Sequence, residues 1–112
     1  MMAAGAAAFV AACGGAPRPE AQMASSEGAI RGASEAGAQT VPQATLYMKL
    51  AEEQRQQALA LIKNGDNGRA AYLLARSEAD AELAIALAKQ ARAQQEAQRA
   101  DQRVQDLQKV QP

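Results

Sequence analysis

The segment Leu61-Ile62-Lys63-Asn64-Gly65-Asp66-Asn67 predicts the end of one long helix and the start of the next. Gly65 supplies the left-handed residue that commonly follows the end of a helix. Asp66 is a favoured N-cap, so the next helix is expected to begin at Asn67. Because helices joined by about two to five residues form antiparallel pairs, we expect a helical hairpin around this turn.

The residues before the turn predict a helix over 43–63. Pro42 suits its first position, where the missing N–H is tolerated. The segment repeats apolar residues at helical spacing, which predicts one face that packs inward. These residues are Leu46, Tyr47, Leu50, Ala51, Ala58, Leu61 and Ile62.

The residues after the turn predict a single helix from Asn67 to about Lys109 with two apolar seams. The first seam is made almost entirely of small residues: Ala70, Leu74, Ser77, Ala81, Ala84, Ala88 and Ala91. The second consists of Leu83, Ala86, Gln90, Ala93, Ala97, Ala100, Val104 and Leu107. Small residues at heptad spacing let helix axes approach closely, so we expect tight packing of coiled-coil character along both seams.

A difference in helix length predicts an overhanging tail over 93–112. A helix over 43–63 covers about 33 Å, which shields only the first half of the helix that follows. The tail is rich in Gln, Ala and Arg, and a lone helix of this length is marginal in water. It therefore either frays or meets a partner, either a second copy or another envelope protein. The residues expected to make that contact are Ala93, Ala97, Ala100, Val104 and Leu107.

The segment before the hairpin predicts a weaker helix over 20–36. Gly28 and Gly32 each cost up to about 1 kcal/mol relative to alanine, and Met23 and Ile30 are its only large apolar anchors. A break is expected at 37–41. The sequence thus predicts an all-α fold, with a hairpin domain over 20–92 and a helical tail over 93–112.

Cys13 is the only cysteine, and it ends an uncharged apolar stretch over 1–12. This arrangement resembles a bacterial lipobox. Twelve residues are too few to span a bilayer but fit the apolar region of a signal peptide. We expect cleavage before Cys13, acylation of its sulfur, and a lipidated tether over 13–19, with several acyl chains giving stable anchoring. An ordinary N-terminus with a free thiol is the alternative.

The composition argues against most enzymatic and nucleic-acid-binding classes. The chain has no histidine, so Ser-His and Cys-His nucleophiles and imidazole metal sites are excluded. Lys plus Arg equals Asp plus Glu at 12 each, without a basic stripe or stacking aromatics for nucleic acid. The carboxylates Glu78, Asp80 and Glu82 are expected on a solvated face, where Arg76 and Asp80 form an attractive i,i+4 pair. We predict no enzyme, no cofactor, no metal and no small-molecule substrate.

The run SEGAIRGASEAGA at 26–38 resembles the opening of a bacterial envelope family, the domain of unknown function 4398. Matching residues continue through VPQA at 41–44, Gly65-Asp66 and ADAELA at 79–84, so the resemblance covers about 25–95. The resemblance implies a helical envelope protein, often a lipoprotein, with no assigned activity or site residues. The segment 65–74 is also similar to tetratricopeptide hairpins, which need about three repeats to build a continuous core.

Together these observations predict a non-enzymatic, lipid-anchored protein of the bacterial cell envelope that acts through helical protein contacts. Gly14 after Cys13 favours the outer membrane by the sorting pattern of enteric bacteria, with the chain facing the periplasm. A small tetratricopeptide-like periplasmic adaptor or chaperone, or a structural envelope tether, remains the alternative. If the first helix starts near the 64–68 turn, the tether holds that turn close to the membrane and the tail points away.

Overall fold

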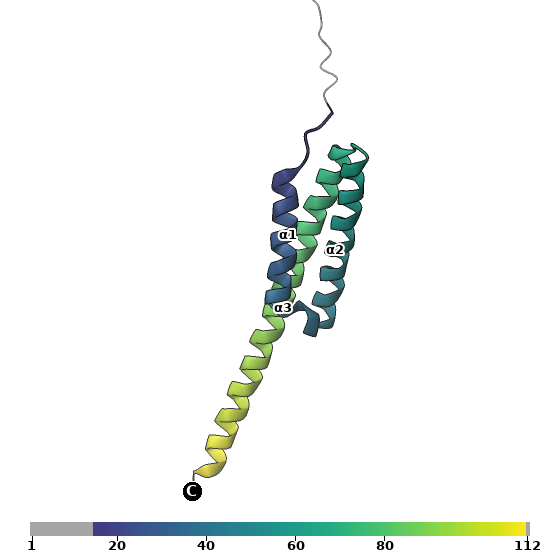
Figure 1. Ribbon diagram of the computed structural model, residues 1–112. Helices are drawn as coiled ribbons and strands as arrows, with labels where there is room; N and C mark the ends of the chain where they lie inside the picture. Colours follow the sequence, from purple (N-terminus) through teal and green to yellow (C-terminus); the bar gives the residue numbers. More distant parts are fainter. Residues whose placement is uncertain (1–14, 112) are drawn as a thin grey trace, which may run out of the picture.

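The computed structural model describes residues 15–111, and this part of the chain contains three α-helices, one 3-10 turn and no strand. The helices are α1 (Glu20–Glu35), α2 (Pro42–Lys63) and α3 (Asn67–Val110), with η1 (Ala38–Thr40) between α1 and α2. Figure 1 shows α1 and α2 lying against the first half of α3, while the second half projects alone. The all-α prediction is confirmed. Cys13 and the predicted signal peptide over 1–12 lie outside the described residues.

The turn between α2 and α3 ends one helix and starts the next as the sequence predicts. Gly65 has a φ of 78°, in the left-handed region. The Asp66 N–H donates to the Leu61 carbonyl at 2.9 Å and the Gly65 N–H donates to the Ile62 carbonyl at 3.0 Å, which is a Schellman motif. The Asp66 carboxylate then accepts from the Arg69 N–H at 3.4 Å and caps α3.

The connection between α1 and α2 is held by contacts to both neighbouring elements. Gly37 has a φ of 86°, and its N–H donates to the Ser34 carbonyl at 3.1 Å. The Thr45 hydroxyl of α2 donates to the Ala38 carbonyl at 2.8 Å. From α3, an Arg92 guanidinium N–H donates to the Ala36 carbonyl at 3.1 Å. This connection therefore fixes where α1 ends relative to α3.

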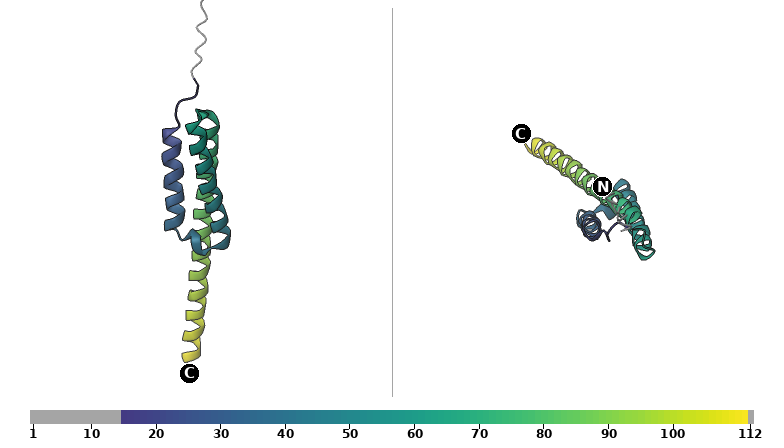
Figure 2. Two further views of the ribbon diagram at one scale, coloured as in Figure 1. Left: turned by 45° about the vertical axis from the view of Figure 1, so that its right-hand side comes forward. Right: turned by 90° about the horizontal axis from the view of Figure 1, so that it is seen from above.

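The direction of each helix follows from contacts along α3. Ser26 contacts Ser77 and Gly32 lies beside Ile85, so α1 runs in the same direction as α3. α2 runs in the direction opposite to α3, because the chain reverses between them at 64–66. Figure 2 shows the three helices side by side from a second angle. Because α1 and α2 flank the same stretch of α3, the bundle ends where α1 ends and α2 begins.

The core consists mainly of alanine. The first seam of α3 is buried from Ala70 to Ala88 at 0–2% exposure, as predicted, and its last residue, Ala91, is half-buried. Leu74 is the only large apolar side chain in the described residues that is fully buried. Met23, Leu61, Ile62 and Leu73 pack partly buried around it. Such a core contains few large side chains, so each of them matters.

One part of the predicted α2 face is wrong. Leu46 is 56% exposed, whereas Met48 is 8% exposed and packs in the core. Met48 lies four residues after Ala44 and three before Ala51, and all three are buried on one line of the helix. Leu46 lies on the opposite side of that line. The helical register set by the alanines therefore decides which large residue is buried.

Candidate interaction surface

The chain enters the bundle beside the turn between α2 and α3. The Asn67 side-chain amide donates to the Ala16 carbonyl at 3.0 Å, which holds the residues before α1 against the start of α3. Pro19 is buried immediately before α1. The predicted lipidation site, Cys13, precedes these residues and lies outside the described range.

The opposite end of the described chain is the unsupported half of α3. Every residue over 92–111 is exposed. The predicted contact residues form one line there, which we call the distal stripe: Ala93, Ala97, Ala100, Val104 and Leu107. Val104 is 54% exposed and Leu107 is 64% exposed, and Val110 beyond the stripe is 80% exposed. The structure leaves all five residues of the distal stripe open to a partner.

The second seam of α3 is exposed within the bundle as well, which corrects the expectation that it packs there. Leu83 is 40% exposed, and Ala86 and Gln90 are exposed. The physical reason is that α1 and α2 both flank the first seam, and the second seam lies on the far side of α3. The distal stripe is therefore the continuation of an exposed line that begins on the bundle at Leu83.

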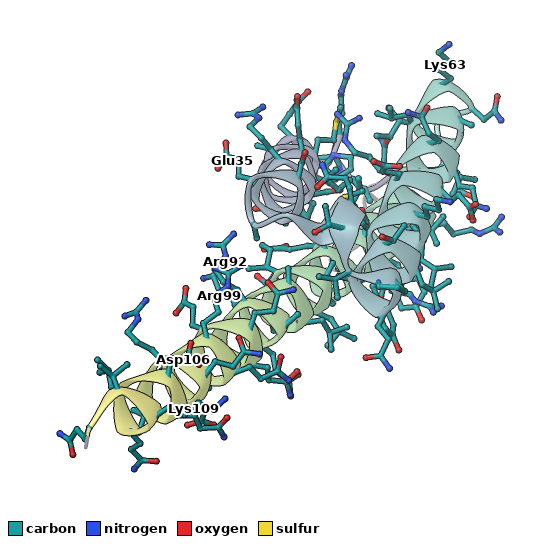
Figure 3. All side chains as sticks on the ribbon, turned by 90° about the horizontal axis from the view of Figure 1, so that it is seen from below. Glu35, Lys63, Arg92, Arg99, Asp106 and Lys109 are labelled. Carbon is teal, nitrogen blue, oxygen red and sulfur yellow. The ribbon has the colours of Figure 1, made fainter. Side chains whose placement is uncertain are left out.

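A shallow hollow marks the place where the distal half of α3 leaves the bundle. It lies between the start of α2 and α3 and has a volume of about 330 Å³. Val41, Pro42, Gln43, Leu87, Gln90, Ala91 and Gln94 line it. Gln90 belongs to the exposed second seam, so the hollow adjoins the line that becomes the distal stripe. A helix lying along that line would reach the hollow. Figure 3 shows the side chains that surround the distal half of α3.

A chain of buried hydroxyl groups joins the three helices at the centre of the bundle. The Ser77 hydroxyl donates to the Ala51 carbonyl at 2.6 Å, and the Ser26 and Ser77 hydroxyl oxygens lie 2.8 Å apart. Since the single Ser77 proton points at Ala51, Ser26 donates to Ser77. Both serines are 0% exposed. Their hydrogen bonds are used within the fold, so they are structural groups and not free nucleophiles.

Sequence reasoning included Ser77 in a seam but missed Ser26. The missed signal was the spacing of Met23, Ser26, Ile30 and Ala33, which places Ser26 on the inward line of α1. The expected Arg76–Asp80 pair does not form. Asp80 accepts from the Gln54 side-chain amide at 2.9 Å, and the Arg76 guanidinium lies 6.0 Å from the Tyr72 ring centre. Asp80 is therefore held by a residue of α2, and Arg76 lies over an aromatic ring of its own helix.

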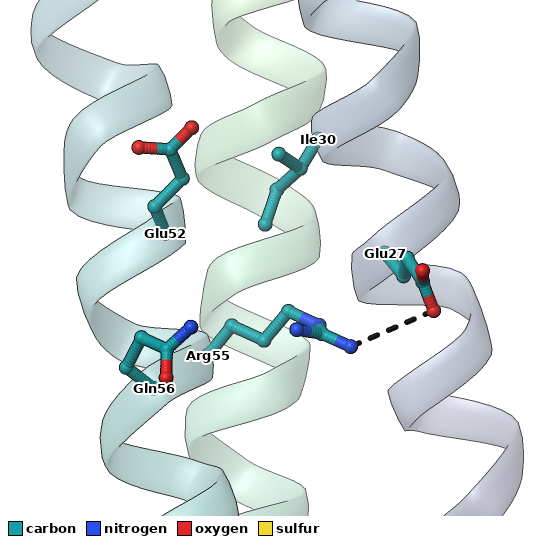
Figure 4. Close-up of a pocket in the computed structure, with 5 residues that line it drawn as sticks. All are labelled: Glu27, Ile30, Glu52, Arg55 and Gln56. Carbon is teal, nitrogen blue, oxygen red and sulfur yellow. Dashed lines mark ion pairs between the residues drawn. The ribbon is translucent and has the colours of Figure 1, made fainter.

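A small pocket lies between α1 and α2 and is drawn in Figure 4. Its volume is about 110 Å³, and Glu27, Ile30, Glu52, Arg55 and Gln56 line it. A guanidinium nitrogen of Arg55 pairs with the Glu27 carboxylate at 3.5 Å across the pocket. Within residues 15–111, no group of three or more acidic or cysteine side chains could hold a metal ion. The pocket has room for a few waters or one side chain.

Comparison with protein families gives one clear assignment. A family model described as domain of unknown function (DUF4398) matches residues 21–100. The chain belongs to the DUF4398 family. The match takes in α1, α2 and α3 as far as Ala100, so it includes the buried seam and the first three residues of the distal stripe. No curated protein and no solved structure matches the chain significantly. Among the described residues, no helix has the length and apolar character needed to cross a bilayer.

Proposed function

We propose that this DUF4398 protein is a lipid-anchored, non-enzymatic protein of the bacterial cell envelope that acts through protein contacts of the distal stripe. The observation that carries the proposal is the separation of the two ends. The tether enters beside Asn67, whereas the exposed stripe extends to Leu107. At 1.5 Å per residue, these two positions lie about 60 Å apart along α3.

The anchor is the sulfur of Cys13. Acyl chains on this sulfur and on the new N-terminus would hold the protein in the bilayer stably, because two or more chains are needed for lasting attachment. Gly14 after the cysteine favours the inner face of the outer membrane, where the helices would face the periplasm. The contact between Ala16 and Asn67 then supports a bundle that meets the membrane with its 64–68 turn.

The interior supports a binding role over a catalytic one. The buried side chains of Ser26 and Ser77 and the half-buried side chain of Gln54 form hydrogen bonds within the fold. In the small pocket, the Glu27 carboxylate is paired with Arg55. The chain has no histidine to serve as a general base near neutral pH. The projecting half of α3, in contrast, exposes three large apolar side chains, which are Val104, Leu107 and Val110.

The anchor is tested by the intact mass of protein extracted from membranes of the native host. We expect a chain that begins at Cys13 and carries acyl chains. The Cys13→Ser variant is the control and should leave the membrane fraction. An unmodified chain that begins at Met1 and stays in the soluble fraction would refute the proposal.

The orientation is tested by photo-crosslinking to lipid from single positions. A probe at Asn67 should label lipid strongly, because that residue lies at the tethered end. A probe at Val104 should label it weakly. Stronger labelling from Val104 than from Asn67 would reject this orientation while leaving the acylation result intact.

A second candidate is a small tetratricopeptide-like adaptor built on an α2–α3 hairpin. The pocket between α1 and α2 favours it, because a pocket of this size accepts one peptide side chain. Here the binding surface lies on the bundle, so Ile30→Ala, which changes a residue lining the pocket, should abolish client binding while helicity is kept. Tyr47→Ala or Leu50→Ala on α2 should do the same. If client binding instead depends on Val104 or Leu107, the adaptor model fails. A structural tether between envelope layers would also use the tail, with its contact made to a fixed envelope component.

A further inference from the structure

We propose that the distal stripe binds a second copy of this chain, with the two α3 helices antiparallel and centred between Ala97 and Ala100. The inference rests on the proposed role of the stripe as a contact surface and names its partner. The exposed second seam repeats at alternating spacings of three and four residues from Leu83 to Leu107. This is the spacing at which one helix packs against another along a heptad seam.

The charges beside the stripe select this arrangement. In the antiparallel pair Ala97 faces Ala100 of the second copy, and Ala93 faces Val104. Glu96 then lies beside Arg103 of the second copy, and the two-fold symmetry repeats this pair. On the other flank Gln94 lies beside Asp101, where an amide can donate to the carboxylate. Glu96, Arg103, Gln94 and Asp101 are all exposed in the single chain.

Other registers bring like charges together. A parallel pair sets Glu96 against Asp101 of the second copy, twice, because flanking residues five positions apart meet in parallel coiled coils. An antiparallel pair shifted by one heptad toward the C-terminus sets Arg103 against Arg103, and Asp101 against Asp101. A shift the other way sets Glu96 against Glu96. Like charges placed opposite one another are unfavourable, so among these four arrangements only the register centred between Ala97 and Ala100 is free of them.

The hollow at the base of the distal half fits the same register. With Ala97 opposite Ala100, Leu107 of the second copy lies opposite Gln90, one of the residues that line the hollow. Leu107 is among the most exposed large apolar residues, at 64%. The antiparallel pair therefore brings an exposed leucine from each copy to a concave surface on the other. Leu107 and Gln90 lie at equal distances on either side of the centre between Ala97 and Ala100. This positional match does not depend on the charges.

The arrangement places the two anchors far apart. Asn67 lies about 47 Å from the centre of the pair along each helix, so the two Asn67 ends are about 95 Å apart. The lipids sit at the two ends of one rod. With both anchors in one bilayer, the paired rod lies along the membrane surface, so the orientation with the tail pointing away from the membrane applies to the single chain.

The first test is the mass of the Cys13→Ser chain in solution, measured by sedimentation over a range of concentrations. We expect a reversible dimer. Leu107→Asn should raise the dissociation constant about 30-fold or more, because it removes apolar contact at both ends of the pair. The matched control is Leu46→Asn, an equally exposed leucine on α2, which should change the constant less than about twofold. A monomer at all concentrations, or an equal effect of both variants, would refute the pairing.

A charge reversal distinguishes the two orientations by sign. Glu96→Arg should weaken the antiparallel dimer about tenfold, because two attractive pairs become repulsive. Adding Arg103→Glu should restore it. Asp106→Arg is the control, since Asp106 lies about 200° around the helix from Val104 and away from the stripe. In a parallel dimer Glu96→Arg would strengthen association instead, because it relieves the repulsion from Asp101.

Cysteine crosslinking fixes the register. In the Cys13→Ser chain, Ala93→Cys mixed with Val104→Cys should form a disulfide on oxidation with copper phenanthroline, because these positions face each other in the antiparallel pair. Neither variant should crosslink to itself. In this register each position lies about 16 Å along the axis from the same position in the second copy, beyond disulfide reach. Self-crosslinking of either variant would indicate a parallel pair and refute the proposal. Acylation at Cys13 is measured separately, so a failure of pairing leaves the anchor proposal standing.

Discussion

Removing the Ser77 hydroxyl tests whether the buried serines specify how the three helices meet. Ser77 donates to the Ala51 carbonyl and accepts from Ser26, and all of these groups are buried. Ser77→Ala leaves the Ser26 hydroxyl without a partner, which costs about 1–3 kcal/mol. Alanine recovers about 0.5 kcal/mol through its higher helix propensity. We therefore expect a net loss of about 1–2 kcal/mol in the free energy of unfolding.

The double variant gives the sharper result. Ser26→Ala together with Ser77→Ala removes both hydroxyls and leaves no orphaned donor, and such paired removal is nearly neutral. Adding Ser26→Ala to the Ser77→Ala chain should therefore raise the free energy of unfolding. Ser25→Ala is the control, because Ser25 is the exposed neighbour of Ser26 and makes the same chemical change. It should alter stability by less than about 0.5 kcal/mol.

The assay is urea denaturation of the Cys13→Ser chain followed by circular dichroism at about 222 nm, where helix is monitored. For a protein whose free energy of unfolding falls by about 1–2 kcal/mol per molar urea, a loss of about 1–2 kcal/mol lowers the urea midpoint by about 1 M. An unchanged midpoint for Ser77→Ala would refute the argument. A double variant less stable than the Ser77→Ala chain would also refute it. In the Ser77→Ala chain the Ser26 hydroxyl has no partner, so removing that hydroxyl should raise the free energy of unfolding.

Three further substitutions, two of them with a matched control, test the core and the helix ends by the same denaturation assay. Leu74→Ala should cost about 2–5 kcal/mol, because Leu74 is fully buried in a core with few large side chains, whereas Leu46→Ala should cost less than about 0.5 kcal/mol. Gly65→Ala should cost about 1–2 kcal/mol because its φ is 78°, whereas Gly28→Ala should stabilise α1 by about 0.5–1 kcal/mol, since its Cβ meets open space. Asp66→Ala should cost about 0.5–2 kcal/mol through loss of the α3 cap. Equal effects within either matched pair, or no effect at Asp66, would contradict the stated causes.

The helix ends could be predicted from local residues because capping acts within about one turn of chain. Pro42 begins α2, Gly65 adopts the left-handed conformation after its end, and Asp66 caps α3, all as expected. The buried seam from Ala70 to Ala88 could also be predicted, since its periodicity is a property of one helix. The exposure of the distal stripe followed from helix lengths, because α2 has 22 residues and α3 has 44.

The contacts between helices could not be predicted, because an alanine-rich sequence offers several lines of nearly equal apolarity on each helix. Only the way the helices come together shows that Met48 is buried and Leu46 is not. The same holds for Ser26, whose partner Ser77 lies 51 positions away in the sequence, and for Asp80, which accepts from Gln54 of α2 instead of pairing with Arg76.

The sequence by itself therefore determined where each helix begins and ends, because those signals are local. The tertiary structure decided that α1 runs parallel to α3, that both neighbours flank one seam, and that the other seam stays open into the distal stripe. The physical reason is that burial depends on which surfaces meet in space. In a core built from side chains as small as alanine, close approach of the backbones and a few buried hydroxyls select that meeting.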